Sequence, residues 1–177
     1  MAQKYKKKNP AFVFGLIVLL VCFLYTLFAN SIPQIEFHPP ERVNITPDMS
    51  QRDLVRTGKM ILNEKGKCLL CHTIGGGGLR APDLVGIGER AETRKKGYSS
   101  EDYLFESLYY PSKYVVEGYV PSMPIVNKPP INLADEEIVA VVSFLQSLDG
   151  KVTVKPTTKP NFEKIGKKQE GDGSENR

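Results

Sequence analysis

The residues most able to do chemistry lie in the stretch KGKCLLCHTIGGGG, which covers residues 65–78. Two cysteines and a histidine (Cys68, Cys71 and His72) fall within five positions of a 177-residue chain that has only 3 cysteines and 2 histidines. Four kinds of site use such a cluster: a zinc site, a redox-active dithiol, a disulfide and a covalent haem attachment site.

The remaining ligands and the flanking sequence help to separate these alternatives. Zinc usually takes four ligands, and the chain offers only Cys22, within an apolar run, and His38, for which a solvated linker position is expected. A thioredoxin-like dithiol needs a βαβ pattern, and no strand-like segment flanks the motif. The order C-x-x-C-H is the signature of c-type haem attachment. It favours one haem c bound through Cys68 and Cys71, with His72 as an iron ligand.

A low-spin haem iron needs a second axial ligand opposite His72, and a methionine thioether suits it. The chain has 4 methionines. Met123 lies in the irregular, proline-bracketed segment VPSMP, so a loop can bring it over the opposite haem face. Met60 is expected in a helix with a core role, and Met49 precedes that helix. We therefore predict His72 and Met123 as the iron ligands.

Residues 11–29, AFVFGLIVLLVCFLYTLFA, are uncharged and almost wholly apolar. Nineteen residues make a helix of roughly 28 Å, about the hydrocarbon thickness of a bilayer. Lysines lie only before this run, which predicts a cytoplasmic N-terminus. A cleaved signal peptide is the main alternative, but its apolar core would be shorter. The run predicts one transmembrane anchor in contact with lipid, with Cys22 an inert buried thiol.

The rest of the chain predicts a small all-α domain. Apolar spacing and serine caps predict a helix after Ser50, a helix over 99–110 and a helix over 132–148. A domain of about 100 residues with so few helices is marginal alone, and a haem would supply the missing core. The predicted organisation is a basic N-terminus at 1–10, an anchor at 11–29, a Pro-rich linker at 30–47, a haem domain at 48–150 and an extended tail at 151–177.

The charge distribution and the low-complexity segments limit the classes of partner that the chain is expected to bind. The formal net charge is +4, but the basic excess lies in the two ends, and residues 10–150 are slightly acidic. No basic stripe interleaved with aromatic residues occurs, so nucleic-acid binding is not expected. The four glycines at 75–78 lack a preceding strand and a G-K-[ST] sequence, so they do not form a P-loop. The tail at 151–177 is expected to bury no core and to lie along a neighbouring subunit.

Over about residues 50–150 the chain resembles class I cytochromes c. The resemblance rests on GKMILNEKGKCLLCHT, APDLVGIGER, VPSMP and LADEEIVAVVSFLQSL. It implies that the Pro82 carbonyl accepts a hydrogen bond from the His72 ring, and that Arg90 and Tyr98 support haem propionates. It also places Gly58 and Phe144 where the first and last helices cross. The absence of tryptophan removes any propionate contact of that type.

The resemblance and the anchor together predict a monohaem electron-transfer protein, with no enzymatic activity of its own, on the periplasmic side of a bacterial inner membrane. Residues 99–124 resemble cytochrome modules attached to respiratory oxidases and quinol-oxidising complexes. The layout of anchor, linker and haem domain also resembles the cytochrome subunit of nitric oxide reductases. The expected partners are redox proteins or subunits of a membrane complex. The alternatives are a tethered shuttle between complexes, and a haem enzyme or gas sensor with an open distal site.

Overall fold

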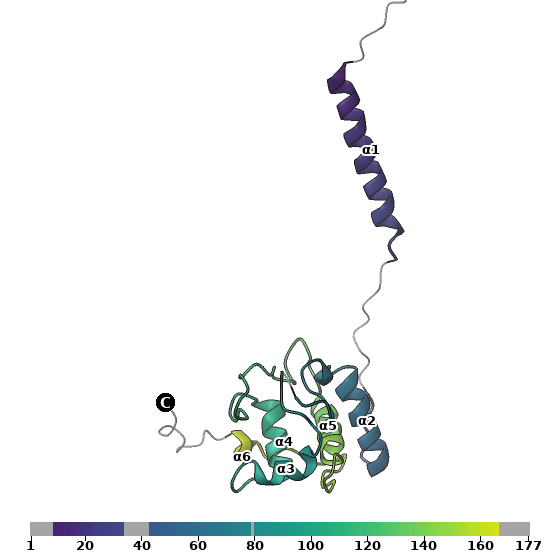
Figure 1. Ribbon diagram of the computed structural model, residues 1–177. Coiled ribbons are helices and arrows are strands. Elements are labelled where there is room, and N and C mark those ends of the chain that lie inside the picture. Colours follow the sequence, from purple (N-terminus) through teal and green to yellow (C-terminus); the bar gives the residue numbers. More distant parts are fainter. Residues whose placement is uncertain (1–8, 34–42, 79, 167–177) are drawn as a thin grey trace, which may run out of the picture. The chain divides into compact units, whose positions relative to one another are not determined.

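The computed structural model describes residues 9–33, 43–78 and 80–166. The regular elements are α1 Pro10–Ser31, α2 Gln51–Asn63, the 3-10 turn η1 Cys68–Leu70, α3 Ile87–Thr93, α4 Ser100–Tyr109, α5 Asp135–Gln146 and α6 Phe162–Gly166 (Figure 1). No strand occurs in these ranges, and the predicted all-α fold class is confirmed. The chain divides into two compact units, residues 1–40 and 41–177.

The first unit holds α1, which has 22 residues. It begins one residue before the predicted apolar run and ends two residues after it, with Pro10 in the first turn, where a missing N–H costs nothing. Every residue of α1 is exposed, and within the described ranges it is the one helix long and apolar enough to cross a membrane. Residues 1–8 and His38 lie outside the described residues.

In the second unit α2 and α5 cross at Gly58. A Cβ atom there would lie 1.9 Å from the Ala140 carbonyl oxygen and 3.0 Å from the Phe144 Cβ. Only a glycine lets the two backbones come this close, which confirms the predicted crossing. Each helix buries an apolar face in the core, with Leu54, Ile61 and Leu62 from α2 and Ile138, Val141 and Val142 from α5.

Two serine caps start helices where the sequence predicts them. Ser50 accepts a hydrogen bond from the Asp53 amide at 3.2 Å at the start of α2. Ser99 and Asp102 exchange side-chain-to-backbone hydrogen bonds of 3.1 Å each at the start of α4. This capping box satisfies two amides that the first turn of a helix leaves unpaired.

A buried ion pair joins the segment before the cysteine motif to α5. The Lys65 ammonium lies 2.7 Å from the Glu137 carboxylate, whose side chain is 1% exposed. Glu137 also accepts a hydrogen bond from the Ala134 amide at 2.8 Å, at the start of α5. A buried carboxylate with both partners is fully satisfied, so one side chain caps α5 and fixes the approach to Cys68.

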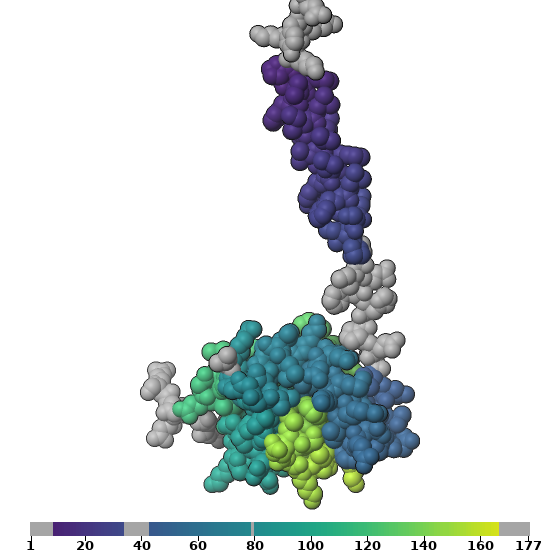
Figure 2. Space-filling view, turned by 45° about the vertical axis from the view of Figure 1, so that its right-hand side comes forward, coloured from purple at the N-terminus to yellow at the C-terminus, as the bar shows by residue number. Residues whose placement is uncertain are grey.

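Residues 151–166, which we name the C-terminal strap, pack on the domain. The prediction that this segment buries no core is wrong, because Val154 and Ile165 are both 0% exposed. The Gln51 amide donates to the Val154 carbonyl at 3.0 Å, and the Lys113 ammonium donates to the Ile165 carbonyl at 2.7 Å. Figure 2 shows yellow-green atoms of the C-terminal part on the surface, between the blue of α2 and teal segments.

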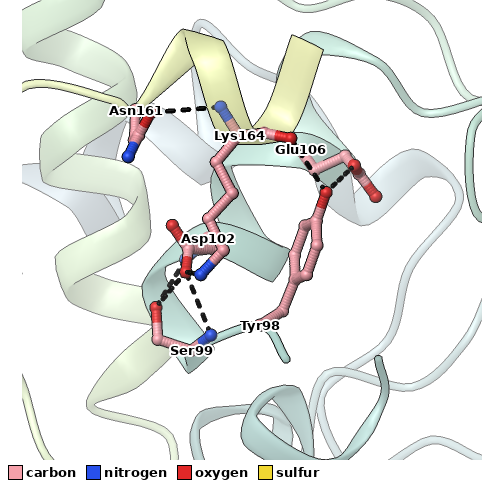
Figure 3. Close-up of polar contacts among 6 residues, drawn as sticks. All are labelled: Tyr98, Ser99, Asp102, Glu106, Asn161 and Lys164. Carbon is pink, nitrogen blue, oxygen red and sulfur yellow. Dashed lines mark hydrogen bonds and ion pairs between the residues drawn. The ribbon is translucent and has the colours of Figure 1, made fainter. Parts of the chain in front are cut away.

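A charged side chain of the strap also forms an ion pair within the domain. Lys164 of α6 pairs with Asp102 of α4 at 2.5 Å (Figure 3). Lys164 thus has a carboxylate partner within the domain. Residues 167–177 of the predicted tail lie outside the described residues.

Candidate functional site

The two cysteines of the motif lie on a tight turn. Lys67 adopts a left-handed backbone conformation before η1, and the His72 amide donates to the Cys68 carbonyl at 2.9 Å. Cys68 and Cys71 are free thiols rather than a disulfide. Burial raises the pKa of the Cys68 thiol to about 11. A redox dithiol needs a lowered thiol pKa, so the environment of Cys68 disfavours that alternative.

The ring of His72 is held in one orientation. Its Nδ1 atom lies 2.8 Å from the Pro82 carbonyl oxygen. Because a carbonyl can only accept, the Nδ1 proton is fixed there, and the lone pair on Nε2 is left for a metal. The Leu84 amide donates to the Thr73 carbonyl at 2.8 Å, which joins the same two segments again. The structure thus brings together His72 and Pro82 as the resemblance implied.

Asp83 organises the glycine-rich loop, and the sequence analysis did not identify it. Its carboxylate accepts hydrogen bonds of 2.7 to 2.9 Å from the Thr73 hydroxyl and from the amides of Gly75, Gly76, Gly77 and Val85. These bonds hold the pKa of Asp83 well below its usual range. Successive amides that converge in this way form an anion-binding nest. Here the nest is filled by the chain's own carboxylate, which agrees with the exclusion of a P-loop.

Arg90 lies next to the same segment. Its guanidinium donates to the Asp83 carbonyl at 2.8 Å and forms a second hydrogen bond with the Val85 carbonyl. Arg90 therefore braces the backbone just after Pro82. A planar guanidinium that is positioned by two carbonyls can still present further N–H groups to a carboxylate.

The three described methionines occupy two kinds of environment. Met123 is partly buried and packs against the core, and Met49 does so as well. The hydroxyl of Tyr119, near Met123, donates to the Gly78 carbonyl at 2.8 Å, so the methionine loop contacts the loop after His72. Met60 is 48% exposed. The core role expected for Met60 is wrong, because its neighbours on α2, rather than Met60, face α5.

The Tyr98 hydroxyl has its described hydrogen-bond partners outside the His72 segment. It contacts the Glu106 carboxylate at 2.9 Å and the Lys164 carbonyl at 3.1 Å (Figure 3). Glu106 is 1% exposed and pairs with Lys95 at 2.5 Å. The Tyr98 hydroxyl is thus engaged by α4 and the strap. Sequence reasoning missed this because the two partners come from segments that are far apart in the sequence.

Apolar side chains remain exposed in the segments around the cysteine motif and around Met123. They are Leu69, Leu70, Ile74, Val85, Val120 and Ile125, each at least 42% exposed. Apolar surface of this kind, next to two thiols and an oriented imidazole, fits the macrocycle of a covalent haem. Among the described residues, no group of three or more His, Cys, Asp or Glu side chains is placed to hold a metal ion.

An all-α domain with a C-x-x-C-H turn and a carbonyl-held histidine defines the class of c-type haem proteins. The family model for cytochrome c matches residues 55–149. The chain belongs to the cytochrome c family, which implies a covalently bound haem c and haem-based electron transfer. No curated protein matches the chain.

Proposed function

We propose that the chain is a membrane-anchored monohaem cytochrome that carries single electrons on the periplasmic face of a bacterial inner membrane. The observation that carries this proposal is the hydrogen bond of 2.8 Å between His72 Nδ1 and the Pro82 carbonyl, next to the free thiols of Cys68 and Cys71. The apolar helix α1 supports a single span. Lysines that precede it in the sequence support a cytoplasmic N-terminus.

The chain's own residues divide the work at this site. When bound, haem supplies the one-electron Fe(III)/Fe(II) couple. Cys68 and Cys71 would hold it covalently, and His72 would ligate the iron through Nε2. The Pro82 carbonyl keeps the imidazole oriented and raises its basicity as a ligand. Met123 would also ligate the iron, through its thioether sulfur, and with both ligands bound no place would remain for a substrate, so we propose a carrier rather than an enzyme.

For its partners, we propose a fixed place in a quinol-oxidising complex or a terminal reductase or oxidase of a respiratory chain. The support is the resemblance of residues 99–124 to cytochrome modules of such complexes. A tethered shuttle is the second candidate. It is favoured by the ion pair between Lys164 and Asp102 within the domain, because the charge of Lys164 then has a partner without a neighbouring subunit.

Purification of the full chain from its membrane in mild detergent tests both parts. We expect covalent haem that stays on the polypeptide in a denaturing gel, and stable co-purification with oxidoreductase subunits. Haem that dissociates on denaturation, or a purified protein without haem, would contradict the proposed attachment through Cys68 and Cys71. Covalent haem on a chain that purifies alone would favour the tethered shuttle.

A further inference from the structure

Arg94 carries a buried donor that nothing in the described part of the chain satisfies. Its Nε atom is shielded from solvent and has no hydrogen-bond partner among the described residues. Buried N–H groups of charged side chains are rarely left unpaired, because each loses its water without compensation. We therefore expect an acceptor at this position when the protein holds its cofactor.

The two basic residues after Arg94 are in different environments. Lys95 is buried and pairs with Glu106 at 2.5 Å. Lys96 is exposed to solvent. Of the three consecutive basic residues 94–96, Arg94 is thus the one with a nitrogen atom that is shielded from solvent and has no described hydrogen-bond partner. A run of solvent-exposed charges would not leave the Arg94 Nε atom buried.

Arg94 lies directly after α3, four residues beyond Arg90, so both guanidiniums project from one face of this turn. Arg90 donates to the Asp83 and Val85 carbonyls. The same segment presents the Pro82 carbonyl to the His72 ring. The helix face that carries Arg94 is therefore continuous with the backbone that orients the proposed iron ligand.

Tyr103 of α4 lies within electrostatic range of both guanidiniums. Its side chain is 6% exposed, and its ring packs edge-on against Tyr114 with a centroid distance of 5.7 Å. Burial raises the pKa of Tyr103, while the positive charges of Arg94 and Arg90 act in the opposite direction. Within the described ranges, neither arginine forms an ion pair with a carboxylate. Two positive charges on one helix face are thus without a carboxylate partner among the described residues, and the Nε atom of one of them is shielded from solvent.

We propose that Arg94, together with Arg90, binds a propionate carboxylate of the haem. The proposal rests on the covalent haem proposed above. Guanidinium groups match a carboxylate through paired N–H donors, and such charge-assisted bonds are among the strongest hydrogen bonds in proteins. Tyr98, to which the resemblance assigned a propionate, directs its hydroxyl to Glu106 and to the Lys164 carbonyl instead. In this proposal Arg94, rather than Tyr98, donates hydrogen bonds to the propionate.

The binding has a measurable consequence for the reduction potential. A guanidinium next to the propionate favours its ionised form and keeps its pKa low, so the potential varies little with pH near neutrality. Without Arg94 the propionate pKa rises. Because the oxidised haem carries one more positive charge and favours the ionised propionate, the potential then falls as the pH rises through that pKa.

The test compares full-length, haem-loaded Arg94→Gln with the wild type and with Lys96→Gln, a control that removes the same charge from an exposed site two residues away. Redox titration over a pH series should show a lower potential near neutral pH and an added fall with rising pH for Arg94→Gln. Lys96→Gln should follow the wild type. Superimposed profiles for all three proteins would overturn the proposal.

A second variant keeps the proposal testable if Arg94→Gln does not accumulate. Arg94→Lys retains the charge but removes the Nε donor. We expect the propionate bending band in its resonance Raman spectrum to shift relative to the wild type, with no shift in Lys96→Arg. An unchanged band in Arg94→Lys would overturn the proposal. A wild-type protein without haem would instead contradict the proposed function.

Discussion

The two segments that carry the proposed iron ligands differ in how the chain holds them. We name residues 72–86 the proximal segment. The Asp83 carboxylate and the contact between His72 and Pro82 link parts of this segment to each other, and the Arg90 guanidinium binds it from α3. Residues 115–125, the methionine segment, form local turns and one described side-chain bond to the rest of the domain, from Tyr119 to the Gly78 carbonyl. Val120 in this segment is 70% exposed.

The difference indicates that the two proposed iron ligands are held in place in different ways. Hydrogen bonds made by the chain preorganise the histidine side, so His72 would need little rearrangement to ligate a haem iron. The methionine side has few described hydrogen bonds of its own, so its order would depend on the proposed ligation by Met123. Segments with few buried contacts open most easily, so we expect ligand loss to begin at Met123.

The largest expected effect comes from removing the strap, which makes no described hydrogen bond with either segment. Deletion of residues 152–177 exposes the sites of Val154 and Ile165. Full burial of such side chains contributes about 1.5–3 kcal/mol each, so we expect a loss of roughly 3–6 kcal/mol in the free energy of unfolding, measured by urea titration. Hydrogen exchange should rise in both segments, while the methionine segment stays the less protected.

A double variant, Lys155→Ala with Lys159→Ala, is the control for the deletion, because both lysines are exposed strap residues. It should unfold at the wild-type urea concentration. A deletion protein as stable as the wild type would contradict the structural role given to Val154 and Ile165. The strap would then be only a solvated end of the domain.

An intermediate effect is expected for Asp83→Ala, which should make the proximal segment as loose as the methionine segment. The variant leaves the amides of Gly75, Gly76 and Gly77 without their acceptor. Amide exchange over 75–77 should accelerate strongly and the melting temperature should fall. Asp149→Asn is the control, because Asp149 has a single bond to the Gly86 amide at 3.2 Å and a left-handed backbone that asparagine tolerates; it should change amide exchange and melting temperature less.

The pH dependence of this effect follows from the lowered pKa of Asp83. A carboxyl whose pKa is lower in the folded state stabilises that state above its ordinary pKa, here 3.8, and loses the contribution as the pH falls below it. The stability difference between the wild type and Asp83→Ala should therefore shrink in acid. A difference that stays constant from neutral pH to below this value would refute the role of the Asp83 charge.

The smallest expected effect is that of Tyr119→Phe, which removes the described bond between the methionine segment and Gly78. A neutral hydrogen bond contributes about 0.5–1.5 kcal/mol, so stability should change little. Cyanide should bind the ferric protein faster, because the methionine segment opens more often. Tyr110→Phe is the control, since the Tyr110 hydroxyl has no hydrogen bond in the described structure. Equal cyanide rates in both variants would indicate that Tyr119 does not restrain this segment.

The sequence predicted those parts of the fold that depend on local signals. Ser50 and Ser99 were recognised as helix starts because a serine cap followed by apolar periodicity is a local pattern. The Asp83 nest was missed, because it requires the turn geometry that brings residues 75–77 back to residue 83. The strap was missed because its composition is polar on average, and its burial depends on two apolar residues whose positions match gaps in the domain.

The Tyr98 assignment shows a further limit of the sequence. A tyrosine at that position could face a propionate or a protein carboxylate, and its spacing from the cysteine motif fits both. Glu106 and the Lys164 carbonyl decide between them in the structure. The Glu106 side chain faces Tyr98 only through the packing of α4, and the carbonyl comes from the strap.

The central claim is that His72 and Met123 hold the iron of a covalent haem, with His72 preorganised and Met123 not. Near-infrared absorption of the ferric full-length protein tests it most directly, with Met123→Ala and the half-exposed Met60→Ala as a pair. We predict the weak band of sulfur-to-iron ligation in the wild type and in Met60→Ala, and its loss in Met123→Ala, with haem still attached and carbon monoxide binding fast to the reduced form. A band that survives in Met123→Ala, or that disappears in Met60→Ala, would contradict this ligand assignment.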